Sequence, residues 1–373
     1  MKRLLPLLLL VLVPAPSPAH ADGCPPSSCG MTSSAIPGAR TVYVRPNGRT
    51  GALMAYDVLT GERLFSLPGG VLSADGKTFI STVWGKKRSR FARFDPRSGR
   101  KLSGSWIRGS WNAAGVTSNG SRYALMHYWK RGVVLRVGRT EASLRGYYDL
   151  DALSPDGRRA YLVHRLDRGY KLQQLDLSTR KLTLTKLDDP SEKMSGTALN
   201  AVATRDGHWL LTLYGKSDMH SFVHALDLRS GVAHCIDLPL IGDFMTLGST
   251  AMTLSPDETT LYLAAPYIGR AASVDLMKLE VGRVTRFGGL SPYNLNMVVG
   301  PSGAVTPNGR MLAFSGQRTV WLYDTAFGAV RQVFHDETPV TGLGFTPDGK
   351  RLLVLQRHGR AAFLDAATGD PVG

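Results

Sequence analysis

The stretch Leu153-Ser154-Pro155-Asp156-Gly157 leads into the apolar run Ala160-Tyr161-Leu162-Val163, and the chain repeats variations of this unit along its length. Proline presets φ for a turn, aspartate hydrogen-bonds its own backbone, and glycine supplies a positive φ. Apolar segments on both sides of such a turn are typical of a β-hairpin. The stretch therefore predicts two antiparallel strands joined by a tight turn.

Seven clear copies of this turn, and a weaker eighth copy around residues 35–43, divide the chain into units. The other six clear copies are Leu72-Ser73-Ala74-Asp75-Gly76, Thr117-Ser118-Asn119-Gly120, Thr204-Arg205-Asp206-Gly207, Leu254-Ser255-Pro256-Asp257-Glu258, Thr306-Pro307-Asn308-Gly309 and Thr346-Pro347-Asp348-Gly349. Spacings of about 40 to 50 residues with several strands per unit are typical of radial repeat architectures. Because helical periodicity is absent over any long window, the sequence predicts an all-β fold.

A second turn signal follows the third strand of most units, where an Asp is followed four residues later by a Gly. The pairs are Asp57 and Gly61, Asp95 and Gly99, Asp227 and Gly231, Asp324 and Gly328, and Asp365 and Gly369. Asp opens such a turn and Gly closes it, so we expect these aspartates to cap turns rather than to catalyse a reaction. Units of four antiparallel strands placed head to tail can close into a ring, which limits exposed sheet edges.

The turn motifs carry a family resemblance. A Ser-Pro-Asp-Gly turn before Tyr- or Leu-rich strands, with a third strand that ends in Asp and then Thr-Gly, resembles the YVTN-type and WD-repeat-like β-propellers over about residues 35–373. Trp321-Leu322-Tyr323-Asp324 approaches the WD signature, but the Gly-His element of the intracellular family is missing. The resemblance implies four-stranded blades and leaves the activity open, because these families include binding scaffolds, surface proteins and enzymes.

The Asp-x-x-x-Gly spacing is also similar to that of quinoprotein propellers, which carry a Trp four residues after the Gly. Here the corresponding positions hold Phe65, Ser103, Cys235 and Gln332. We therefore expect no quinone cofactor, and no other cofactor is indicated.

The number of blades follows from the second strand of each unit. Eight such strands are predicted to begin at Thr41, Thr78, Arg122, Arg159, His208, Thr260, Met311 and Arg351. Eight blades are therefore favoured. The last unit stops after its third strand, so an N-terminal strand could complete its sheet, and a ring of seven is the alternative.

The first 21 residues have the features of an export signal. Met1-Lys2-Arg3 is positively charged, residues 4–13 are apolar but too short to span a bilayer, and Ala19-His20-Ala21 fits a cleavage site. We expect residues 1–21 to be removed, residues 22–38 to form a lead-in, and residues 39–373 to form the propeller. The expected location is extracellular, in the cell wall or in the periplasm, with no transmembrane segment.

Export permits disulfides, and the chain has three cysteines. Cys24 and Cys29 close a short loop and are the candidate pair, which leaves Cys235 as a single thiol. Asp22-Gly23 does not fit the small apolar residues that usually precede a lipidated cysteine, so we expect no lipid anchor at Cys24.

The chain is strongly basic, with 45 Lys and Arg against 29 Asp and Glu and a formal net charge of +16. Such a charge attracts polyanions, which for an exported protein are envelope polymers or anionic lipid headgroups. No nucleic-acid-binding module is recognisable, so we expect no nucleic-acid partner. A basic solvated surface without a ligand is an equally open interpretation.

In a propeller the tight turns lie on one face, and the longer connections, where ligands usually bind, lie on the other. Each predicted loop between the second and third strands contains Lys or Arg. The candidate ligand-binding residues are Lys86, Lys87, Arg88, His127, Trp129, Lys130, His164, Arg165, Lys216, Arg270 and Arg357. Lys and Arg also follow many tight turns, so the basic excess is not confined to one face.

The leading hypothesis is a non-catalytic exported propeller that binds a protein or an anionic envelope ligand. The alternative is a lactonase-like hydrolase with a cluster drawn from His127, His164, Asp167, Asp218 and His220. A structural role in a surface layer is a third possibility. His220 and His224 share one face of a strand but lack further ligands, so no metal site is expected. No nucleophile elbow, zinc-protease helix or Walker loop occurs.

Overall fold

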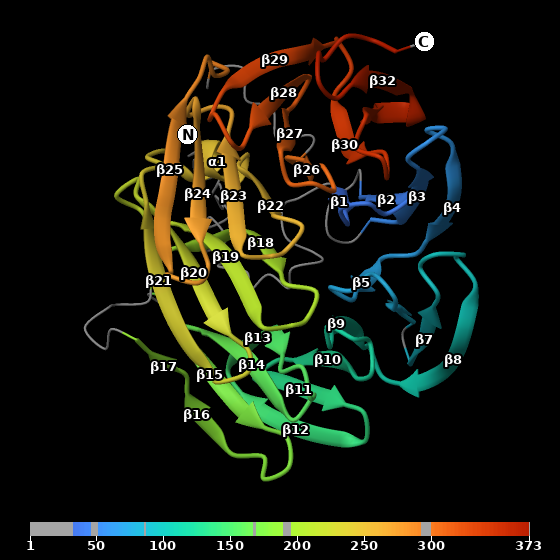
Figure 1. Ribbon diagram of the computed structural model, residues 1–373. Helices are drawn as coiled ribbons and strands as arrows, with labels where there is room; N and C mark the ends of the chain where they lie inside the picture. Colours follow the sequence, from blue (N-terminus) through green and yellow to red (C-terminus); the bar gives the residue numbers. More distant parts are fainter. Residues whose placement is uncertain are drawn as a thin grey trace, which may run out of the picture.

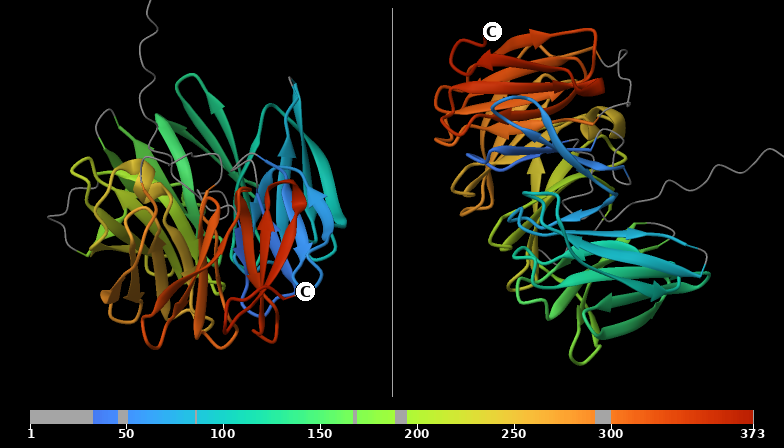
Figure 2. Two further views of the ribbon diagram at one scale, coloured as in Figure 1. Left: turned by 90° about the horizontal axis from the view of Figure 1, so that it is seen from above. Right: turned by 90° about the vertical axis from the view of Figure 1, so that its right-hand side faces the viewer.

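The computed structural model describes residues 33–45, 51–85, 87–166, 169–188, 195–291 and 300–372. These residues form eight antiparallel sheets around a central axis, as Figure 1 shows. Seen from the side in Figure 2, the sheets stand next to one another like the blades of a propeller.

The first four blades take up the N-terminal half of the chain. Blade 1 is β1 (Ser33–Ala35), β2 (Thr41–Val44), β3 (Leu53–Asp57) and β4 (Arg63–Leu67); blade 2 is β5 (Gly70–Leu72), β6 (Phe79–Val83), β7 (Arg88–Phe94) and β8 (Lys101–Arg108). Blade 3 is β9 (Asn112–Val116), β10 (Tyr123–Trp129), β11 (Gly132–Val137) and β12 (Thr140–Arg145); blade 4 is β13 (Tyr147–Leu153), β14 (Arg159–Arg165), β15 (Tyr170–Asp176) and β16 (Leu182–Leu184).

The other four blades follow the same pattern. Blade 5 is β18 (Thr197–Ala203), β19 (Trp209–Gly215), β20 (Ser221–Asp227) and β21 (Val232–Leu238), with β17 (Lys186–Leu187) parallel to β21 at its edge; blade 6 is β22 (Ala251–Leu254), β23 (Thr260–Ala265), β24 (Arg270–Asp275) and β25 (Glu280–Arg286). Blade 7 is β26 (Gly303–Val305), β27 (Met311–Gly316), β28 (Thr319–Asp324) and β29 (Val330–His335); blade 8 is β30 (Val340–Phe345), β31 (Arg351–Gln356) and β32 (Ala361–Asp365). A short helix, α1 (Phe244–Gly248), joins blades 5 and 6, and a 3-10 turn, Arg357–Gly359, lies in blade 8.

The prediction of eight blades is confirmed. The second strand of every blade begins at the predicted residue or one residue after it. Among the described residues blade 8 has three strands, and a bridge between Leu364 and Pro371 extends its outer edge. β1 pairs with β2 and so belongs to blade 1, which excludes the seven-bladed alternative. Its position also puts the first strand inside the range expected for the lead-in.

The repeated turn has the predicted geometry. In six turns the last residue is a glycine with φ between 64° and 73°. Its backbone N–H donates to the carbonyl of a Ser or Thr three positions earlier. These glycines are Gly76, Gly120, Gly157, Gly207, Gly309 and Gly349. The Ser or Thr hydroxyl donates to the Asp or Asn of the turn, as Ser154 does to Asp156 at 2.6 Å. The turn is therefore stabilised by its own side chains.

The Asp-x-x-x-Gly turns also form as predicted. Gly61 N–H donates to the Asp57 carbonyl at 2.8 Å, and the Asp57 carboxylate accepts from the backbone N–H of Leu59 at 2.7 Å. The corresponding bonds hold the turn at Asp365. These carboxylates are therefore engaged in turn capping, as expected.

Between neighbouring blades the sheets pack face to face through apolar side chains. Phe314 and Trp321 of blade 7 form one buried cluster with Ala264 and Ala271 of blade 6, and the Phe287 ring after β25 lies 5.4 Å from the Phe314 ring between centroids. Blade 8 packs on blade 1 in the same manner, with Leu353 and Leu355 against Val42 and Val44. Within the described residues, no helix is long and apolar enough to cross a membrane.

Candidate functional site

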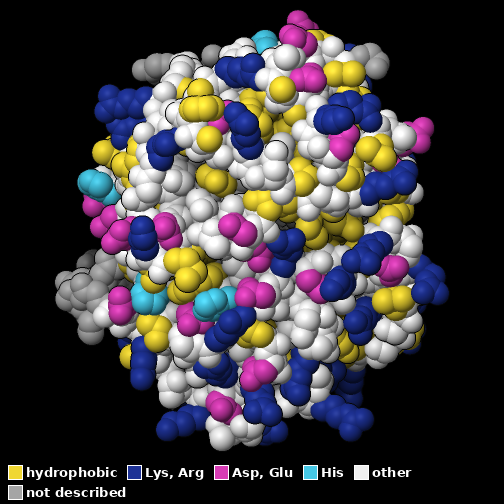
Figure 3. Space-filling model, in the orientation of Figure 1, with side chains coloured by type: hydrophobic (Ala, Val, Ile, Leu, Met, Phe, Trp, Pro, Cys, Tyr) yellow, Lys and Arg dark blue, Asp and Glu magenta, His cyan; other side chains and the backbone are white. Residues whose placement is uncertain are grey.

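The ring has two different ends. The tight turns between the first and second strands, and between the third and fourth, form what we call the turn face. The connections between the second and third strands, and those between blades, including α1, form what we call the loop face. Figure 3 views the turn face, where hydrophobic side chains occupy the centre and Lys and Arg side chains are spread over the rim. Lys and Arg side chains are therefore also present on the face opposite to the predicted ligand-binding residues.

The predicted ligand-binding residues lie on the loop face but are not brought into one site. Lys87, Arg88, His127, Trp129, Lys130, His164 and Arg165 belong to blades 2 to 4, whereas Lys216, Arg270 and Arg357 belong to blades 5, 6 and 8. Lys86 lies outside the described residues.

Several of these side chains are engaged by the protein itself. Arg165 Nε donates to the Asp149 carboxylate at 2.5 Å, and an Arg270 guanidinium nitrogen donates to the Pro239 carbonyl at 2.5 Å. Lys216 Nζ lies 3.6 Å from the Asp237 carboxylate. These three cations support the local structure, which reduces their capacity to bind a ligand.

The two histidines of this group also have partners. His127 Nδ1 lies 2.7 Å from the Ser110 carbonyl oxygen. His164 stacks on Tyr148 with ring centroids 4.2 Å apart, and burial, with a smaller effect from Lys171, lowers the pKa of His164. Both rings are therefore fixed in place next to the loop face.

Exposed aromatic side chains gather at the loop-face ends of blades 2 to 4, and we call them the aromatic patch. They are Trp84, Trp106, Tyr128, Trp129 and Tyr147. Trp84 and Tyr147 are the most open, at 66% and 67% of their full exposure. A single exposed apolar side chain is common on a protein surface, but several that together form contiguous apolar surface mark an interaction site.

Contacts within blade 2 and between blades 3 and 4 support the patch. Arg88 lies over the Trp106 ring, 4.3 Å from its centroid. The Tyr128 hydroxyl donates to the Asp149 carboxylate at 3.0 Å, which joins blade 3 to blade 4. Gly146 N–H donates to the Arg131 carbonyl at 3.1 Å, next to Tyr147. Blades 3 and 4 therefore hold their parts of the patch together, and blade 2 contributes the Arg88–Trp106 pair at the same end of the ring.

The surroundings of the aromatic patch are positively charged. At the loop-face ends of blades 2 to 4, the described basic residues include Lys87, Arg88, Arg108, Lys130, Arg131 and Arg145. The described carboxylate in this region is Asp149, which is already bonded to Tyr128 and Arg165. The patch therefore combines exposed aromatic rings with an uncompensated positive field.

The residues proposed for a hydrolase do not form a catalytic cluster among the described residues. Asp218 and His220 lie 3.3 Å apart on an exposed hairpin of blade 5. His127 and His164 belong to blades 3 and 4 and have the partners given above. Asp167 lies outside the described residues, as do Cys24 and Cys29. In the described part of the chain, no three His, Cys, Asp or Glu side chains are placed to hold a metal ion.

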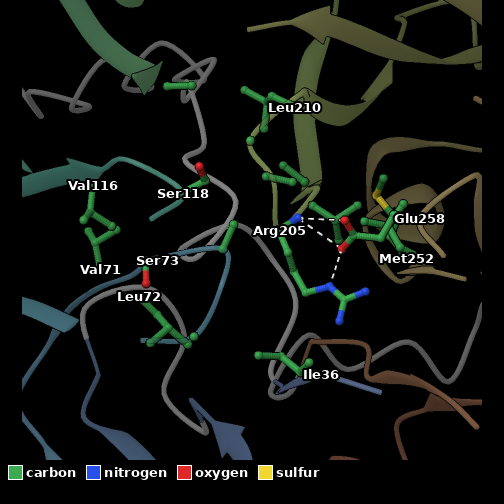
Figure 4. Close-up of a pocket in the computed structure, with 18 of the residues that line it drawn as sticks. Ile36, Val71, Leu72, Ser73, Val116, Ser118, Arg205, Leu210, Met252 and Glu258 are labelled. Carbon is green, nitrogen blue, oxygen red and sulfur yellow. Dashed lines mark hydrogen bonds and ion pairs between the residues drawn. The ribbon is translucent and has the colours of Figure 1, made fainter. Parts of the chain in front are cut away.

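A cavity of about 200 Å³ occupies the central channel on the side of the turn face. Figure 4 shows aliphatic side chains of the inner strands around it, among them Val71, Leu72, Val116 and Met252. The turns of blades 1 to 3, 5 and 6 form its rim. The channel is therefore apolar inside and opens on the face opposite to the aromatic patch.

An ion pair bridges two turns at this rim. Arg205 of the blade 5 turn donates from its backbone N–H at 3.0 Å and from Nε at 2.8 Å to the Glu258 carboxylate, as Figure 4 shows. A second guanidinium nitrogen of Arg205 donates to the Pro256 carbonyl at 2.6 Å. Glu258 has φ of 60° and occupies the turn position that is glycine in six other turns. Its carboxylate thus offsets part of the strain of its backbone.

The chain resembles other propellers in structure but not in sequence. No protein-family model and no curated protein sequence matches it. The Dos1 propeller superposes with a TM-score of 0.53 at 11% identity, over 88% of this chain and 90% of that chain. The likeness shows the fold alone.

Two further solved structures give lower scores. The β-propeller domain of Myceliophteria thermophila Cps50 (Swd1) has a TM-score of 0.49 and 12% identity, over 91% of this chain and 96% of that chain. Hydrazine synthase of Kuenenia stuttgartiensis has a TM-score of 0.42 and 14% identity, over 79% of this chain and 94% of that chain. Neither adds to the assignment of the fold.

The channel contains a charged residue that the sequence analysis missed. Asp151 lines the cavity from β13 and is 1% exposed, and neither of its carboxylate oxygens has a hydrogen-bond partner among the described residues. The equivalent residues, three positions before the turn Ser or Thr, are Gly70, Ala114, Ala201, Met252, Gly303 and Leu343. An alignment of the repeats against one another would have revealed this single carboxylate.

Proposed function

We propose that the protein is a binding scaffold that holds a protein partner through the aromatic patch on the loop face of blades 2 to 4. The exposed aromatic patch is the observation that carries this proposal. Aromatic side chains dominate the energy of protein interfaces, and nearby cations such as Arg88 and Lys130 favour a partner surface with negative charge. The partner would therefore present apolar side chains within an acidic surface.

The regular part of the fold supports the same role. The tight turns fix the blades without contributing exposed aromatic rings to the loop face, so the patch rests on a rigid base. Preorganised surfaces lose less conformational entropy on binding than mobile ones do. A catalytic role has no comparable support, because His127, His164 and the exposed Asp218–His220 pair lie on three different blades.

The test replaces three exposed rings of the patch by serine, in a Trp84→Ser, Trp129→Ser, Tyr147→Ser variant. We expect partner affinity to fall roughly 100-fold, because each buried aromatic anchor typically contributes more than about 1 kcal/mol. The partner would first be identified by cross-linking to the unmodified protein, and affinity then measured by surface plasmon resonance across a salt series. Binding should weaken as salt rises, since the cations around the patch are exposed.

The matched control replaces three exposed apolar side chains on outer strands, in a Leu64→Ser, Leu184→Ser, Val284→Ser variant. This control should bind the partner as the unmodified protein does. If the patch variant keeps full affinity while the control loses it, the partner binds the rim of the ring and the proposal is wrong.

We also propose that the protein is exported and that residues 1–21 are removed. The charged start, the apolar run and Ala19-His20-Ala21 support this. N-terminal sequencing of the protein recovered from outside the cytoplasm should give Asp22 as the first residue. Recovery of the chain with Met1 in the cytoplasm alone would contradict export.

A further inference from the structure

The central cavity has a wall of aliphatic side chains and space for a small organic molecule. Its volume of about 200 Å³ exceeds the roughly 150 Å³ of an engineered apolar cavity that binds benzene. Val71, Val116, Leu210 and Met252 come from four different blades and are among the residues around it (Figure 4). An apolar body of a ligand would therefore find contacts on several sides.

Four charged side chains line this cavity, and three of them have partners. Arg205 and Glu258 bond to each other at the rim. Arg45, which is 5% exposed, donates to the Gly70 carbonyl at 2.7 Å. Asp151 differs, because both of its oxygens are buried and have no partner among the described residues. An isolated buried carboxylate is costly in its charged form, so the site lacks a counter-charge.

The titratable groups near Asp151 do not supply a positive charge that would balance its carboxylate. Asp149 lies two residues before it on β13, and the charge of Asp151 also acts on Tyr170 of β15 and Tyr214 of β19. Cys235 of β21 acts on the same two tyrosines. Burial, and to a smaller extent the charge of Asp149, raises the pKa of Asp151 to about 7. The carboxyl therefore exists in both forms near neutral pH.

We propose that the central cavity binds a protonated primary amine with an apolar body, whose ammonium group pairs with the carboxylate of Asp151. A cation offsets the cost of burying the Asp151 carboxylate, whereas a neutral molecule or an anion does not. Asp151 lies three residues before the turn that starts at Ser154, which corresponds to a depth of about 10 Å below the rim. An aryl or alkyl chain of that length would fill the apolar part of the cavity above it.

The rim is compatible with entry of such a ligand. Because the charge of Arg205 is balanced by Glu258, the mouth does not repel an ammonium group as a bare cation would. This site lies on the turn face, whereas the aromatic patch lies on the loop face. Its occupation therefore does not depend on the partner proposed above.

The experiment compares 2-phenylethylamine with 2-phenylethanol, which has the same apolar body and no charge. Isothermal titration calorimetry would be run at about pH 5.5 and about pH 8.5, on either side of the pKa of Asp151 and below that of an alkylammonium group. We expect the amine to bind at least about tenfold more tightly than the alcohol at the higher pH, which corresponds to one salt-bridge contact of about 1.4 kcal/mol. Its affinity should fall by a factor similar to that preference, and by at most about 30-fold, at the lower pH, as the ionised fraction of Asp151 falls.

The Asp151→Asn variant tests which group is responsible. It removes a buried unpaired charge, so it should fold and should be more stable than the unmodified protein above about pH 7. In this variant the amine should lose both its advantage over the alcohol and its pH dependence. The proposal is wrong if the amine binds no better than the alcohol, if the preference survives in Asp151→Asn, or if neither compound binds.

A second variant tests the location of the ligand. Leu72→Trp adds bulk to the cavity wall, and Leu102→Trp makes the same change at an exposed position on the outer strand of the same blade. Binding of both compounds should be lost in the first variant and unchanged in the second. Binding that persists in Leu72→Trp would locate the amine outside the channel.

Discussion

The turn face and the loop face of this ring are built from opposite kinds of connection. Each tight turn repeats one geometry, and its polar side chains bond to the turn itself, as Ser154 and Asp156 do. The loops differ from blade to blade and leave aromatic rings such as Trp84 and Tyr147 open to solvent. The residues of the repeated turns therefore hold the ring together, and the residues of the variable loops are available to a partner.

The channel is an exception to this division between a regular structural face and an irregular binding face. Its cavity lies on the side of the regular face, and it is lined by inner-strand residues that precede the turns. Asp151 and Glu258 are both exceptions to the repeat, the first in a strand and the second in a turn. On the turn face, the residues that point to a specific role are thus those that depart from the repeated sequence.

The two faces should differ most in how much stability is lost when a glycine is replaced by a residue with a side chain. In Gly120→Val, the added Cβ would lie 2.1 Å from Thr78 Oγ1, and φ is 70°. We expect a loss of about 3 kcal/mol in the free energy of unfolding, from backbone strain and overpacking together. Chemical denaturation followed by tryptophan fluorescence would measure it.

The matched change on the loop face is Gly288→Val. Gly288 follows β25 in the connection to blade 7, is exposed, and has no atom within 4 Å of an added Cβ. Its free energy of unfolding should change by less than about 0.5 kcal/mol. Equal losses in the two variants would remove the distinction between a structural and a permissive face.

A smaller effect is expected at Glu258, where the turn face departs from its own pattern. Glu258→Ala keeps a side chain at positive φ and loses the bonds to Arg205, whereas Glu258→Gly loses the same bonds but relieves the backbone. We expect the glycine variant to be more stable than the alanine variant by about 1 kcal/mol. Thermal unfolding of the two variants side by side would show it, and identical midpoints would mean that the turn is not strained.

The architecture could be predicted because its signals are local. A turn such as Ser154 to Arg159 forms from the residues within it, so each copy indicates a hairpin wherever it occurs. The number of blades followed from counting these turns. The closure could not be predicted in the same way, because the packing of blade 8 on blade 1 brings together residues from opposite ends of the chain, such as Val42 and Leu353.

The candidate sites were predicted less completely. Residue type and spacing located Arg88 and Trp129 at the loop face, although both are strand residues, at the start of β7 and the end of β10. They did not predict the approach of Arg88 to Trp106 or the exposure of Tyr147. Arg165 and Arg270 were expected to face a ligand and instead bond to the protein, since sequence does not show which carboxylate or carbonyl lies nearby. The cavity itself arises only when several blades meet around one axis.

The seam between blades 1 and 8 determines how the ring can be opened. Val42 and Val44 approach Gly344 and Gly342 so closely that a Cβ on either glycine would lie 2.2 Å or 2.6 Å from a valine methyl group. In the described residues no strand is shared across this seam, and each blade is one continuous segment of chain. The order of the blades around the axis is therefore independent of where the chain is cut. A circular permutant whose ends lie at another junction between blades would keep every interface of the ring, with the present seam joined by a linker.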